Sequence, residues 1–393
     1  MTDTNFHRDA VAAIIECILP GIIETRHHLH QNPELSGQEQ ATSAYVAERL
    51  RALKLDDVRT GLAGHGVTAI LRGRQEGPML ALRADMDALP IQETSGREYA
   101  SCKPEVMHAC GHDGHTATLL GTAQVLSEVR EFLPGPVKFI FQPAEETVGG
   151  ADGMIAAGVL DGVAAIVALH GWPNLEIGQI GYRAGPMMAS ADTFDLTVKG
   201  VGGHAAYPQT TVDPIVVGSQ IVGAWQTLAS REVSPLDSAV VTVTQFHAGT
   251  AYNVIPGVAA LKGTVRTLSN AVRDEMPAKL ERIAAGVCTA YRAEYEFSMS
   301  FGPPVVENDP ALTALVEAVG QDVLPPGGVT FLETPTMGAE DFAYYLRRIP
   351  GVMFRLGVGT DVTALHTPTY NFSDGALKYG MTMLANLALR YGA

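Results

Sequence analysis

The sequence predicts an α/β protein whose mainly parallel central sheet is interrupted by an inserted α+β domain. Short apolar runs bounded by glycine and proline, typical of buried strands, alternate with longer amphipathic runs typical of helices. Residues 185–300 instead follow the strand-helix-strand-strand-helix-strand order of a ferredoxin-like unit. The first pattern resumes after Gly302-Pro303-Pro304, so we expect one discontinuous domain, residues 1–184 and 301–393, and one inserted domain.

The first domain is expected to begin with helices. Amphipathic runs over residues 10–19 and 22–30 predict two helical segments separated by a break at Pro20-Gly21. Residues 39–53 predict the next helix. The histidines of the second run are spread around the helix by their spacing, so we expect them to have structural roles rather than to bind one ligand.

Five apolar runs predict the buried strands of the parallel sheet, and polar residues follow most of them. Asp85 and Asp87 follow the second run, a pair of glutamates follows the third, and His170 follows the fourth. A loop that contains His366 follows the fifth, before a closing helix that starts near Asp374. Because the carboxyl ends of parallel strands meet at one edge of the sheet, we expect these polar residues to converge. The five runs are Val67–Leu71, Met79–Arg83, Val137–Phe141, Ala164–Leu169 and Val352–Leu356.

The inserted domain begins with a change of pattern near Gly185. Its sequence carries no cluster of metal-ligating residues, so we expect it to be a separate unit from the first domain. The expected elements are strand Thr193–Val198, helix Pro214–Ala229, strands Val240–Phe246 and Gly257–Leu268, helix Val272–Tyr291 and strand Glu294–Ser300.

Composition limits the kind of protein. The 393 residues are 46% hydrophobic and 18% charged, which is typical of a globular chain with a large core. A formal net charge of −15 argues against nucleic acid or an anionic membrane as a partner. The four cysteines have no framework spacing, which favours a reducing compartment. Without a secretion signal or a run of membrane-spanning length, we expect a cytoplasmic protein.

The stretch Met107–His115, which reads MHACGHDGH, places imidazoles, a thiol and a carboxylate among glycines. Such mixed donors suit borderline transition metals such as zinc, manganese or nickel. Cys110 and His112 are two positions apart, so in extended backbone both side chains can reach one ion. A polar loop whose histidines cap the following helix is the alternative, because Cys-x-His alone is a weak pattern.

A second feature is the pair of adjacent carboxylates Glu145 and Glu146. Neighbouring side chains diverge, so one glutamate can bind metal while the other moves a proton above it. Each candidate taken alone has an ordinary structural explanation, but their coincidence at the strand ends favours a metal site. The donors are numerous enough for a binuclear hydrolytic centre with a shared water. They are Cys110, His112, Glu145, Glu146, His170 and His366.

Four motifs together closely resemble the M20 metallopeptidase family. They are ALRADMDALP at 81–90, MHACGHDGH at 107–115, QPAEE at 142–146 and KGVGGHAAYP at 199–208. The specific resemblance is to the amidohydrolase subgroup, which contains hippurate hydrolases, N-acyl-L-amino acid amidohydrolases and plant auxin-conjugate hydrolases. It extends over nearly the whole chain, with the motifs in the family's order. It implies a zinc-peptidase-like catalytic domain and an inserted lid or dimerisation domain.

The resemblance also implies roles for individual residues. Glu145 matches the general base of a site with two divalent ions per subunit, whether zinc, manganese, nickel or cobalt. Where the wider family has His-x-Asp, this chain has Asp85-Met86-Asp87, so one usual imidazole is absent. The thiolate of Cys110 would replace that ligand, and Asp85 and Asp87 would orient ligands. The implied metal ligands are Cys110, His112, Glu146, His170 and His366.

Residues of the inserted domain and a late loop complete the implied site. His204 matches a histidine that, in homodimers, reaches the partner's active site and stabilises the oxyanion. Asn253 and Arg266 match polar positions near the substrate, where either would hold an amino acid carboxylate. Gly338 matches a position in a loop that lines the pocket. From the residues alone, His204 could equally be a turn histidine and Arg266 an exposed cation on a strand.

The function expected from the resemblance is hydrolysis of the amide bond of N-acyl amino acids to a carboxylic acid and a free amino acid. A dipeptidase or carboxypeptidase of the same family is the alternative. Two further alternatives are a metal-free hydrolase with Cys110 as nucleophile and a binding protein without activity. The expected partners are a small-molecule substrate and a second copy of the chain.

Overall fold

The computed structural model describes residues 4–147 and 149–393, which form two compact units. The first unit runs to Gly185 and continues through Glu307–Glu333 and Asp341–Ala393, and the second comprises Pro186–Val306 and Thr334–Glu340. This division differs from the expected one at Gly185 and at residues 301–306 and 334–340. The later segment joins the second unit because Thr336 N donates to Met187 O and Ala189 N donates to Gly338 O. A lid or dimerisation role for this unit stays a prediction.

The first unit is built on an eight-stranded sheet. Its central strands β4, β3, β5 and β16 are parallel, and the outer strands include antiparallel neighbours. All residues of β4 and β16 are buried, as expected of strands that are covered on both faces. The predicted mainly parallel sheet is therefore confirmed. The strands, in spatial order, are β1 (Asp56–Leu62), β2 (Gly66–Leu71), β4 (Val137–Gln142), β3 (Met79–Asp85), β5 (Val163–Trp172), β16 (Gly351–Gly357), β6 (Ile180–Tyr182) and β15 (Val329–Phe331).

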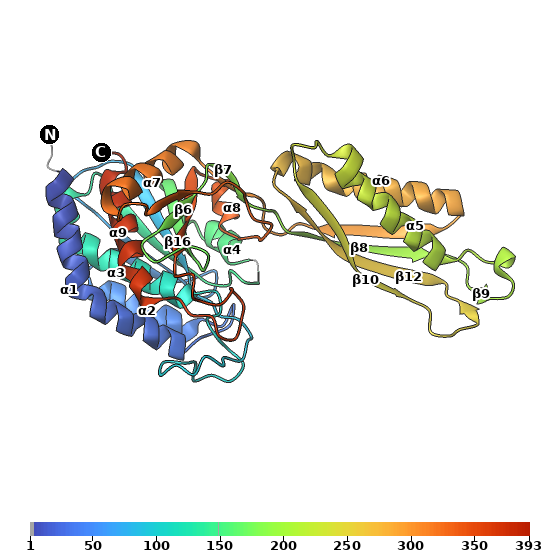
Figure 1. The fold of residues 1–393 in the computed structure, drawn as a ribbon, viewed down its shortest axis with the longest axis horizontal. Coiled ribbons are helices and arrows are strands. Elements are labelled where there is room, and N and C mark those ends of the chain that lie inside the picture. Colours follow the sequence, from blue (N-terminus) through green and yellow to red (C-terminus); the bar gives the residue numbers. More distant parts are fainter. Residues whose placement is uncertain (1–3, 148) are drawn as a thin grey trace. The chain divides into compact units, whose positions relative to one another are not determined.

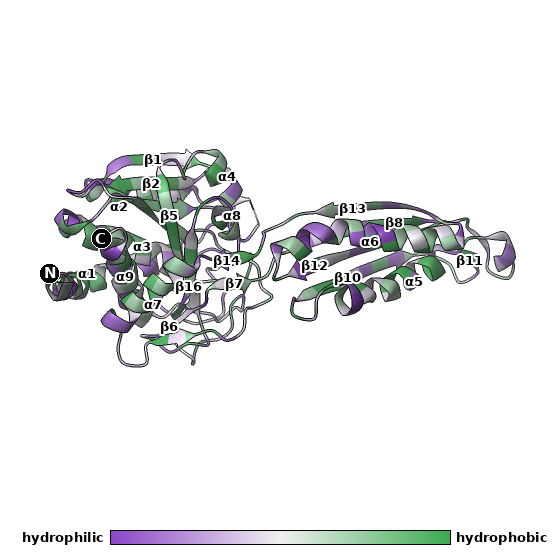
Figure 2. Ribbon diagram, turned by 90° about the horizontal axis from the view of Figure 1, so that it is seen from above, coloured by the Kyte–Doolittle hydropathy of each residue, from purple (hydrophilic) through white to green (hydrophobic). Residues whose placement is uncertain are grey.

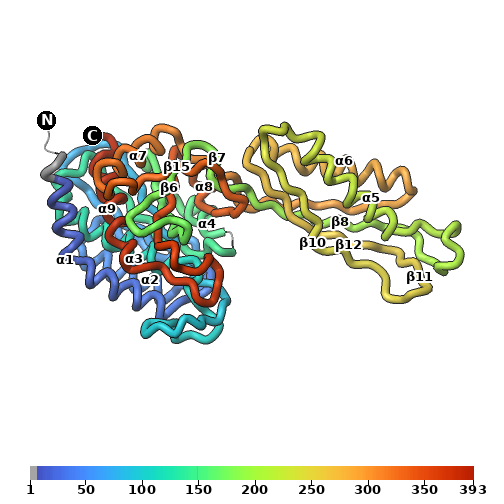
Figure 3. The backbone as a smooth tube through the Cα atoms, viewed as in Figure 1, coloured from blue at the N-terminus to red at the C-terminus, as the bar shows by residue number. Residues whose placement is uncertain are grey.

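Helices cover the sheet of the first unit (Figure 1 and Figure 2). Helices α1 and α9, which come from opposite ends of the chain, pack against each other and against α3 (Figure 3). The short helices α4 and α8 pack together and contact β4 and β16 respectively. The helices are α1 (Thr4–Gln31), α2 (Gln40–Ala52), α3 (His112–Glu128), α4 (Gly150–Ala156), α7 (Pro310–Val323), α8 (Ala343–Leu346) and α9 (Asp374–Arg390).

The expected break in the first helix is wrong, because α1 continues through Pro20. A proline inside a helix costs about 3 kcal/mol, since it removes one hydrogen bond and crowds the preceding turn. Burial of one large aliphatic side chain contributes roughly 1.5–3 kcal/mol. Val11, Ile15, Ile22 and Leu29 lie on both sides of Pro20 and are at most 3% exposed. A shared core for both halves of the helix therefore outweighs the local effect of proline.

The second unit has the predicted ferredoxin-like arrangement. Its sheet has the order β10-β12-β8-β13 with every neighbour antiparallel. Burial alternates along β8, and the buried residues form a separate core with helices α5 and α6 around Trp225. The elements are β8 (Asp192–Lys199), β9 (Gly203–His204), α5 (Pro214–Thr227), β10 (Ala239–Ala248), β11 (Val254–Ile255), β12 (Val258–Thr267), α6 (Asn270–Tyr291) and β13 (Glu294–Ser300). In the described residues, every helix is too short or too polar to span a bilayer.

A buried charge network attaches α1 to the start of α3. Arg26 Nη1 donates to Asp113 Oδ2 at 3.2 Å, and His30 Nδ1 lies 2.9 Å from the same oxygen. The other ring nitrogen of His30 lies 3.3 Å from Glu93 Oε1. Burial lowers the pKa of His30, but the Asp113 and Glu93 carboxylates raise it more, to about 9. The structural role expected for this histidine agrees with these contacts.

We expect this network to make stability depend on pH through His30. A raised folded-state pKa gives stability that is complete below the ordinary value of 6.5 and is lost as pH rises through about 9. Relative to a His30→Gln variant, the wild-type protein should lose up to roughly 3 kcal/mol of unfolding free energy between about pH 6 and pH 10. Urea unfolding of both proteins measures this difference. A difference that does not change with pH would contradict it.

Candidate metal centre

The candidate residues of the first unit lie at the carboxyl edge of the parallel strands. Asp85 ends β3, Glu145 and Glu146 follow β4, and the loop after β16 carries His366. His170 lies inside β5 rather than after it, because pairing of β5 with β16 continues to Trp172. The stretch before α3 and the first residue of that helix reach the same edge and bring Cys110 and His112 respectively.

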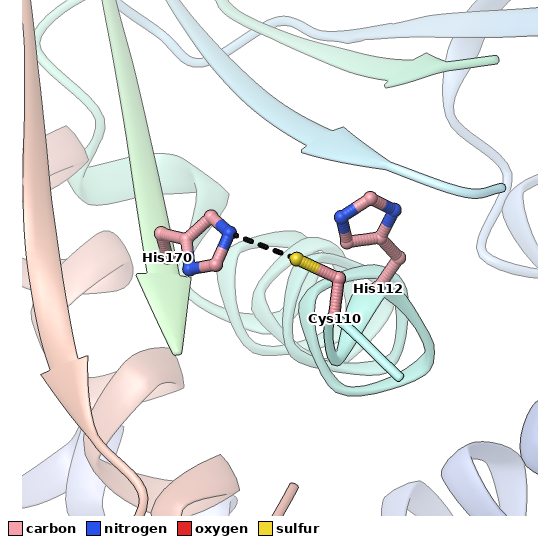
Figure 4. Close-up of side chains that lie close together, drawn as sticks. All are labelled: Cys110, His112 and His170. Carbon is pink, nitrogen blue, oxygen red and sulfur yellow. Dashed lines mark hydrogen bonds between the residues drawn. The ribbon is translucent and has the colours of Figure 1, made fainter. Parts of the chain in front are cut away.

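Cys110, His112 and His170 form a donor group in which all three residues are buried. Their donor atoms all lie within 4.8 Å of one another, and Cys110 Sγ is 3.5 Å from His170 Nε2 (Figure 4). Gly111 lies between the first two with φ = +89°, a backbone conformation that favours glycine. A Cβ at this position would also come within 2.9 Å of the Tyr370 hydroxyl. The turn that presents the thiol and the imidazole therefore requires glycine.

Three further donor groups overlap the first, and two of them contain Glu146. Cys110, Glu146 and His366 form one of these two, and His112, Glu145 and Glu146 form the other, each with donor atoms within 4.8 Å. His366 Nε2 lies 3.4 Å from Glu146 Oε1. The His366 amide donates to Ala109 O at 2.8 Å, which holds the late loop against the Met107–His115 stretch. Overlapping groups that share Cys110 have the donor arrangement expected around two neighbouring cations.

Hydrogen bonds orient the two buried imidazoles toward this space. Nδ1 of His112 donates to the backbone oxygen of Asp87 at 2.9 Å, with the Asp87 carboxylate at 3.2 Å. Nδ1 of His170 donates to Gly171 O at 2.8 Å. In the neutral form of each ring Nε2 then keeps its lone pair, and this is the form that binds metal.

Two buried atoms support the fit of a cation. Within the described residues, His112 Nε2 and Glu146 Oε1 are buried and have no hydrogen-bond partner. A buried acceptor without a partner costs about 1–3 kcal/mol, and more if it is charged. A divalent cation accepts both lone pairs, so the donor set fits a metal site.

The protonation of the donors follows from burial and from neighbouring groups. Burial lowers the pKa of His112, but Asp85 and Cys110 raise it well above its ordinary value, so a cation would have to displace a proton from this ring. Burial raises the pKa of the Cys110 thiol well above its ordinary value. Burial and the neighbouring His115 lower the pKa of His170 to about 3, so this ring is neutral. Because metal binds the thiolate and the neutral imidazole, a cation would bind with release of the Cys110 proton.

A buried guanidinium that sequence analysis did not assign supports the site. Arg83 donates to Asp85 Oδ2 at 2.7 Å, to Gln142 Oε1 at 2.9 Å and to Asp341 Oδ1 at 2.9 Å. The Asp341 amide in turn donates to Glu145 Oε1 at 3.4 Å. Arg83 thus connects the ends of β3 and β4 with the segment that contacts Glu145. A single arginine inside the apolar run 79–85 was the available sequence signal.

His115 is a second residue that sequence analysis left unassigned. Its Nδ1 donates to Asp85 Oδ1 at 2.7 Å, and its Nε2 accepts from Gly171 N at 2.8 Å. Both ring nitrogens are therefore used, although the ring lies close to His112 and His170. Asp85 is thus connected to the backbone of β5 through His115, whereas Asp87 contacts His112 directly. The predicted orienting role of both aspartates remains a prediction that these contacts support.

The remaining candidate residues lie in the second unit, at two ends of its sheet. His204 in β9 is exposed, and the Ala205 amide donates to Asn253 O at 3.0 Å, so His204 and Asn253 are neighbours. Arg266 lies near the opposite end of β12 from Val258, roughly 26 Å away along the strand.

Gly338 belongs to the same end of the sheet as Arg266. Gly338 O accepts from Ala189 N at 3.0 Å, and the next residue, Ser190, donates to Thr267 O at 2.9 Å. Within this unit, the structure therefore groups His204 with Asn253 and Arg266 with Gly338.

Comparison with known proteins identifies the family. The model of peptidase family M20/M25/M40 matches residues 81–390. The chain belongs to this family. The N-acetylcysteine deacetylase of Bacillus subtilis is 42% identical to it over 369 residues, 94% of this chain and 96% of that protein. The N-acyl-L-amino acid amidohydrolase of Geobacillus stearothermophilus is 46% identical over 305 residues, 77% and 82% of the two chains.

A solved structure gives the same assignment. The YXEP protein of Bacillus subtilis, described as a dinuclear metal binding peptidase from the M20 family, superposes with a TM-score of 0.85 and 37% identity. The match covers 95% of this M20 chain and 98% of that one. The predicted family, its fold and its hydrolytic class are thereby confirmed.

We expect Asp87 to control metal affinity through the His112 ring. Asp87→Ala should weaken divalent metal binding roughly 10- to 100-fold, because partners that orient a ligand typically contribute this much. Competition with a chelating dye measures the affinity of the metal-stripped protein. Asp161→Asn, a change at an exposed carboxylate in the turn before β5, is the matched control. Equal affinities for both variants would argue against the orienting role.

Proposed function

We propose that this M20 enzyme hydrolyses the amide bond of N-acyl amino acids and releases a carboxylic acid and a free amino acid. The observation that carries the proposal is the placement of Glu145 beside Glu146 and the buried Cys110–His112–His170 donor group. The names of the deacetylase and amidohydrolase relatives support the substrate class.

Five residues would hold two divalent cations. Zinc, manganese, nickel and cobalt all accept a mixture of thiolate, imidazole and carboxylate ligands. When bound, such cations supply Lewis-acid polarisation of the scissile carbonyl and lower the pKa of a water toward neutrality. The ligands would be Cys110, His112, Glu146, His170 and His366.

Glu145 would transfer the proton of the attacking water. Its side chain is only 9% exposed and lies within reach of His112 and Glu146, with the Asp341 amide on Oε1. A carboxylate in this position takes the proton of the attacking water and passes it to the leaving amine. The Asp341 contact would keep the carboxylate aimed at the reacting atoms.

The second unit would contribute substrate contacts. The acidic chain, with a net charge of −15, needs a local cation or dipole to hold the carboxylate of the amino acid. Arg266 or Asn253 would supply it, and Gly338 would line the pocket. Because His204 in β9 lies beyond the Val258 end of β12 and Arg266 lies near the other end of that strand, one unit cannot bring both to the same small substrate. We propose that His204 stabilises the oxyanion in the partner's site of a homodimer. Because Asn253 lies beside His204, it would act, like His204, in the partner's site.

Cytoplasmic location is part of the same proposal. Cys110 is a free cysteine and must be reduced to bind metal. A reducing compartment maintains that state.

A substrate screen tests the reaction. Protein loaded with each metal in turn is expected to release free amino acid from N-acetyl, N-benzoyl or indole-acetyl amino acids faster than from dipeptides. A chelator should abolish turnover, and added divalent metal should restore it. Faster cleavage of dipeptides would favour a peptidase, and turnover in the presence of chelator would favour a cysteine nucleophile.

Glu145→Gln isolates the proton-transfer role. The amide has nearly the same size but is not a base, so kcat should fall roughly 10²- to 10⁴-fold. The metal content and the chelator affinity of the variant should stay close to those of the wild-type protein. Unchanged kcat would exclude Glu145 as the base.

Mixed dimers test the role of His204. His204→Ala and Glu145→Gln chains should each be inactive, but a mixed dimer has one site with an intact Glu145 and the partner's His204. Co-expression should therefore restore about a quarter of the wild-type activity. The negative control is a homodimer of the chain that carries both substitutions, because neither of its sites has Glu145 or the partner's His204. No restoration in dimers shown to be mixed would contradict the exchange.

A further inference from the structure

The loop between α1 and α2, residues 32–39, makes three contacts with two segments of the candidate site. Glu34 O accepts from Ala88 N at 2.8 Å, and Ser36 Oγ donates to Asp87 Oδ2 at 2.6 Å. The carboxylate of Glu39 accepts from the Ala144 amide at 2.8 Å. The first two contacts lie just after β3, and the third lies directly before the Glu145–Glu146 pair.

Ala144 has an uncommon backbone conformation. Its φ is +54°, in the left-handed region that costs an L-residue other than glycine roughly 1–2 kcal/mol. Alanine has no polar side chain with which to stabilise that conformation locally. Contacts from elsewhere must therefore hold it. They are the Glu39 contact on its N–H and a longer one from Gly150 N to its carbonyl, at 3.3 Å.

Burial of the Glu39 carboxylate has a large desolvation cost. Glu39 is 0% exposed, and Oε1 accepts from both Gly37 N and Ala144 N, at 2.9 and 2.8 Å. Within the described residues its Oε2 is buried without a hydrogen-bond partner. Burial of a carboxylate without a cation is unfavourable unless its hydrogen bonds offset the cost. Its two amide contacts are therefore the physical reason for a carboxylate at this position.

A second carboxylate holds the other side of the same turn. The Glu146 amide donates to Asp87 Oδ2 at 3.0 Å, the oxygen that also accepts from Ser36. The amides on either side of Glu145 are thus fixed by Glu39 and Asp87. The backbone conformation between these two amides sets the direction in which the Glu145 and Glu146 side chains point.

We propose that Glu39 is a positioning residue that holds Ala144 in its left-handed conformation and thereby aims Glu145 and Glu146 into the metal site. The effect on catalysis rests on the proposed function, in which Glu145 is the base and Glu146 a metal ligand. The effect on the turn itself does not depend on any substrate.

The test uses three variants of the full-length enzyme. Glu39→Ala removes both amide contacts and should lower kcat roughly 10- to 100-fold, because small displacements of reacting groups have effects of this size. KM should change less than about threefold, since substrate contacts are untouched. Glu39→Gln keeps one acceptor oxygen and should recover most of the activity. Glu34→Ala is the matched control, because the Glu34 carboxylate accepts from Ala41 N and Thr42 N at the start of α2.

Hydrogen–deuterium exchange supplies a readout without substrate. In metal-free protein, Glu39→Ala should increase amide exchange in residues 143–147, whereas Glu34→Ala should increase it at the start of α2. The double variant Glu39→Ala/Ala144→Gly should have a kcat several-fold higher than that of Glu39→Ala alone, because glycine adopts the left-handed conformation without strain.

Three results would overturn the proposal. They are unchanged exchange in residues 143–147, a loss of kcat equal to that of Glu34→Ala, or no recovery with Ala144→Gly. Failure of the proposed function has a different signature. If the enzyme cleaves no N-acyl amino acid but Glu39→Ala still loosens residues 143–147 and weakens metal binding, the positioning role stands without that reaction.

Discussion

The buried guanidinium of Arg83 is the interaction on which the rest of the centre depends. It compensates two buried carboxylates, Asp85 and Asp341, and removing one partner of such a set typically costs 3–5 kcal/mol. Through Asp85 it reaches His115 and the backbone of β5 beside His170. Through Asp341 it reaches the amide that contacts Glu145. One charge in the sheet thus supports both the metal ligands and the proposed base.

The buried carboxylates of this acidic chain have different partners. Asp85 and Asp341 accept from Arg83, Asp113 from Arg26, and Glu39 from two amides. Each of them therefore has at least one protein donor. Glu39 and Asp113 nevertheless share with Glu146 one oxygen that is buried without a hydrogen-bond partner in the described part of the chain. Position separates Glu146 as a candidate ligand, because its carboxylate lies within 4.8 Å of donor atoms of Cys110, His112 and His366.

The elements predicted well were those whose own residues carry the signal. The apolar runs that became β4 and β16 are buried along their whole length, so they are apolar throughout. Strand β1 was missed because most of its residues are partly or fully exposed, which removes the apolar pattern. The break expected at Pro20 was wrong because the rule is local, whereas the core beside α1 is formed by residues from the rest of the chain.

The sequence by itself determined the family, the order of the strands along the chain and the chemical types of the donors, because contiguous motifs carry all three. The tertiary structure alone decided which polar groups contact one another. The Ala144 amide and Glu39, or Arg83 and Asp341, are far apart in the chain and meet only through the packing of the sheet and its loops. A hydrogen bond depends on distance and angle in space, which no local spacing specifies.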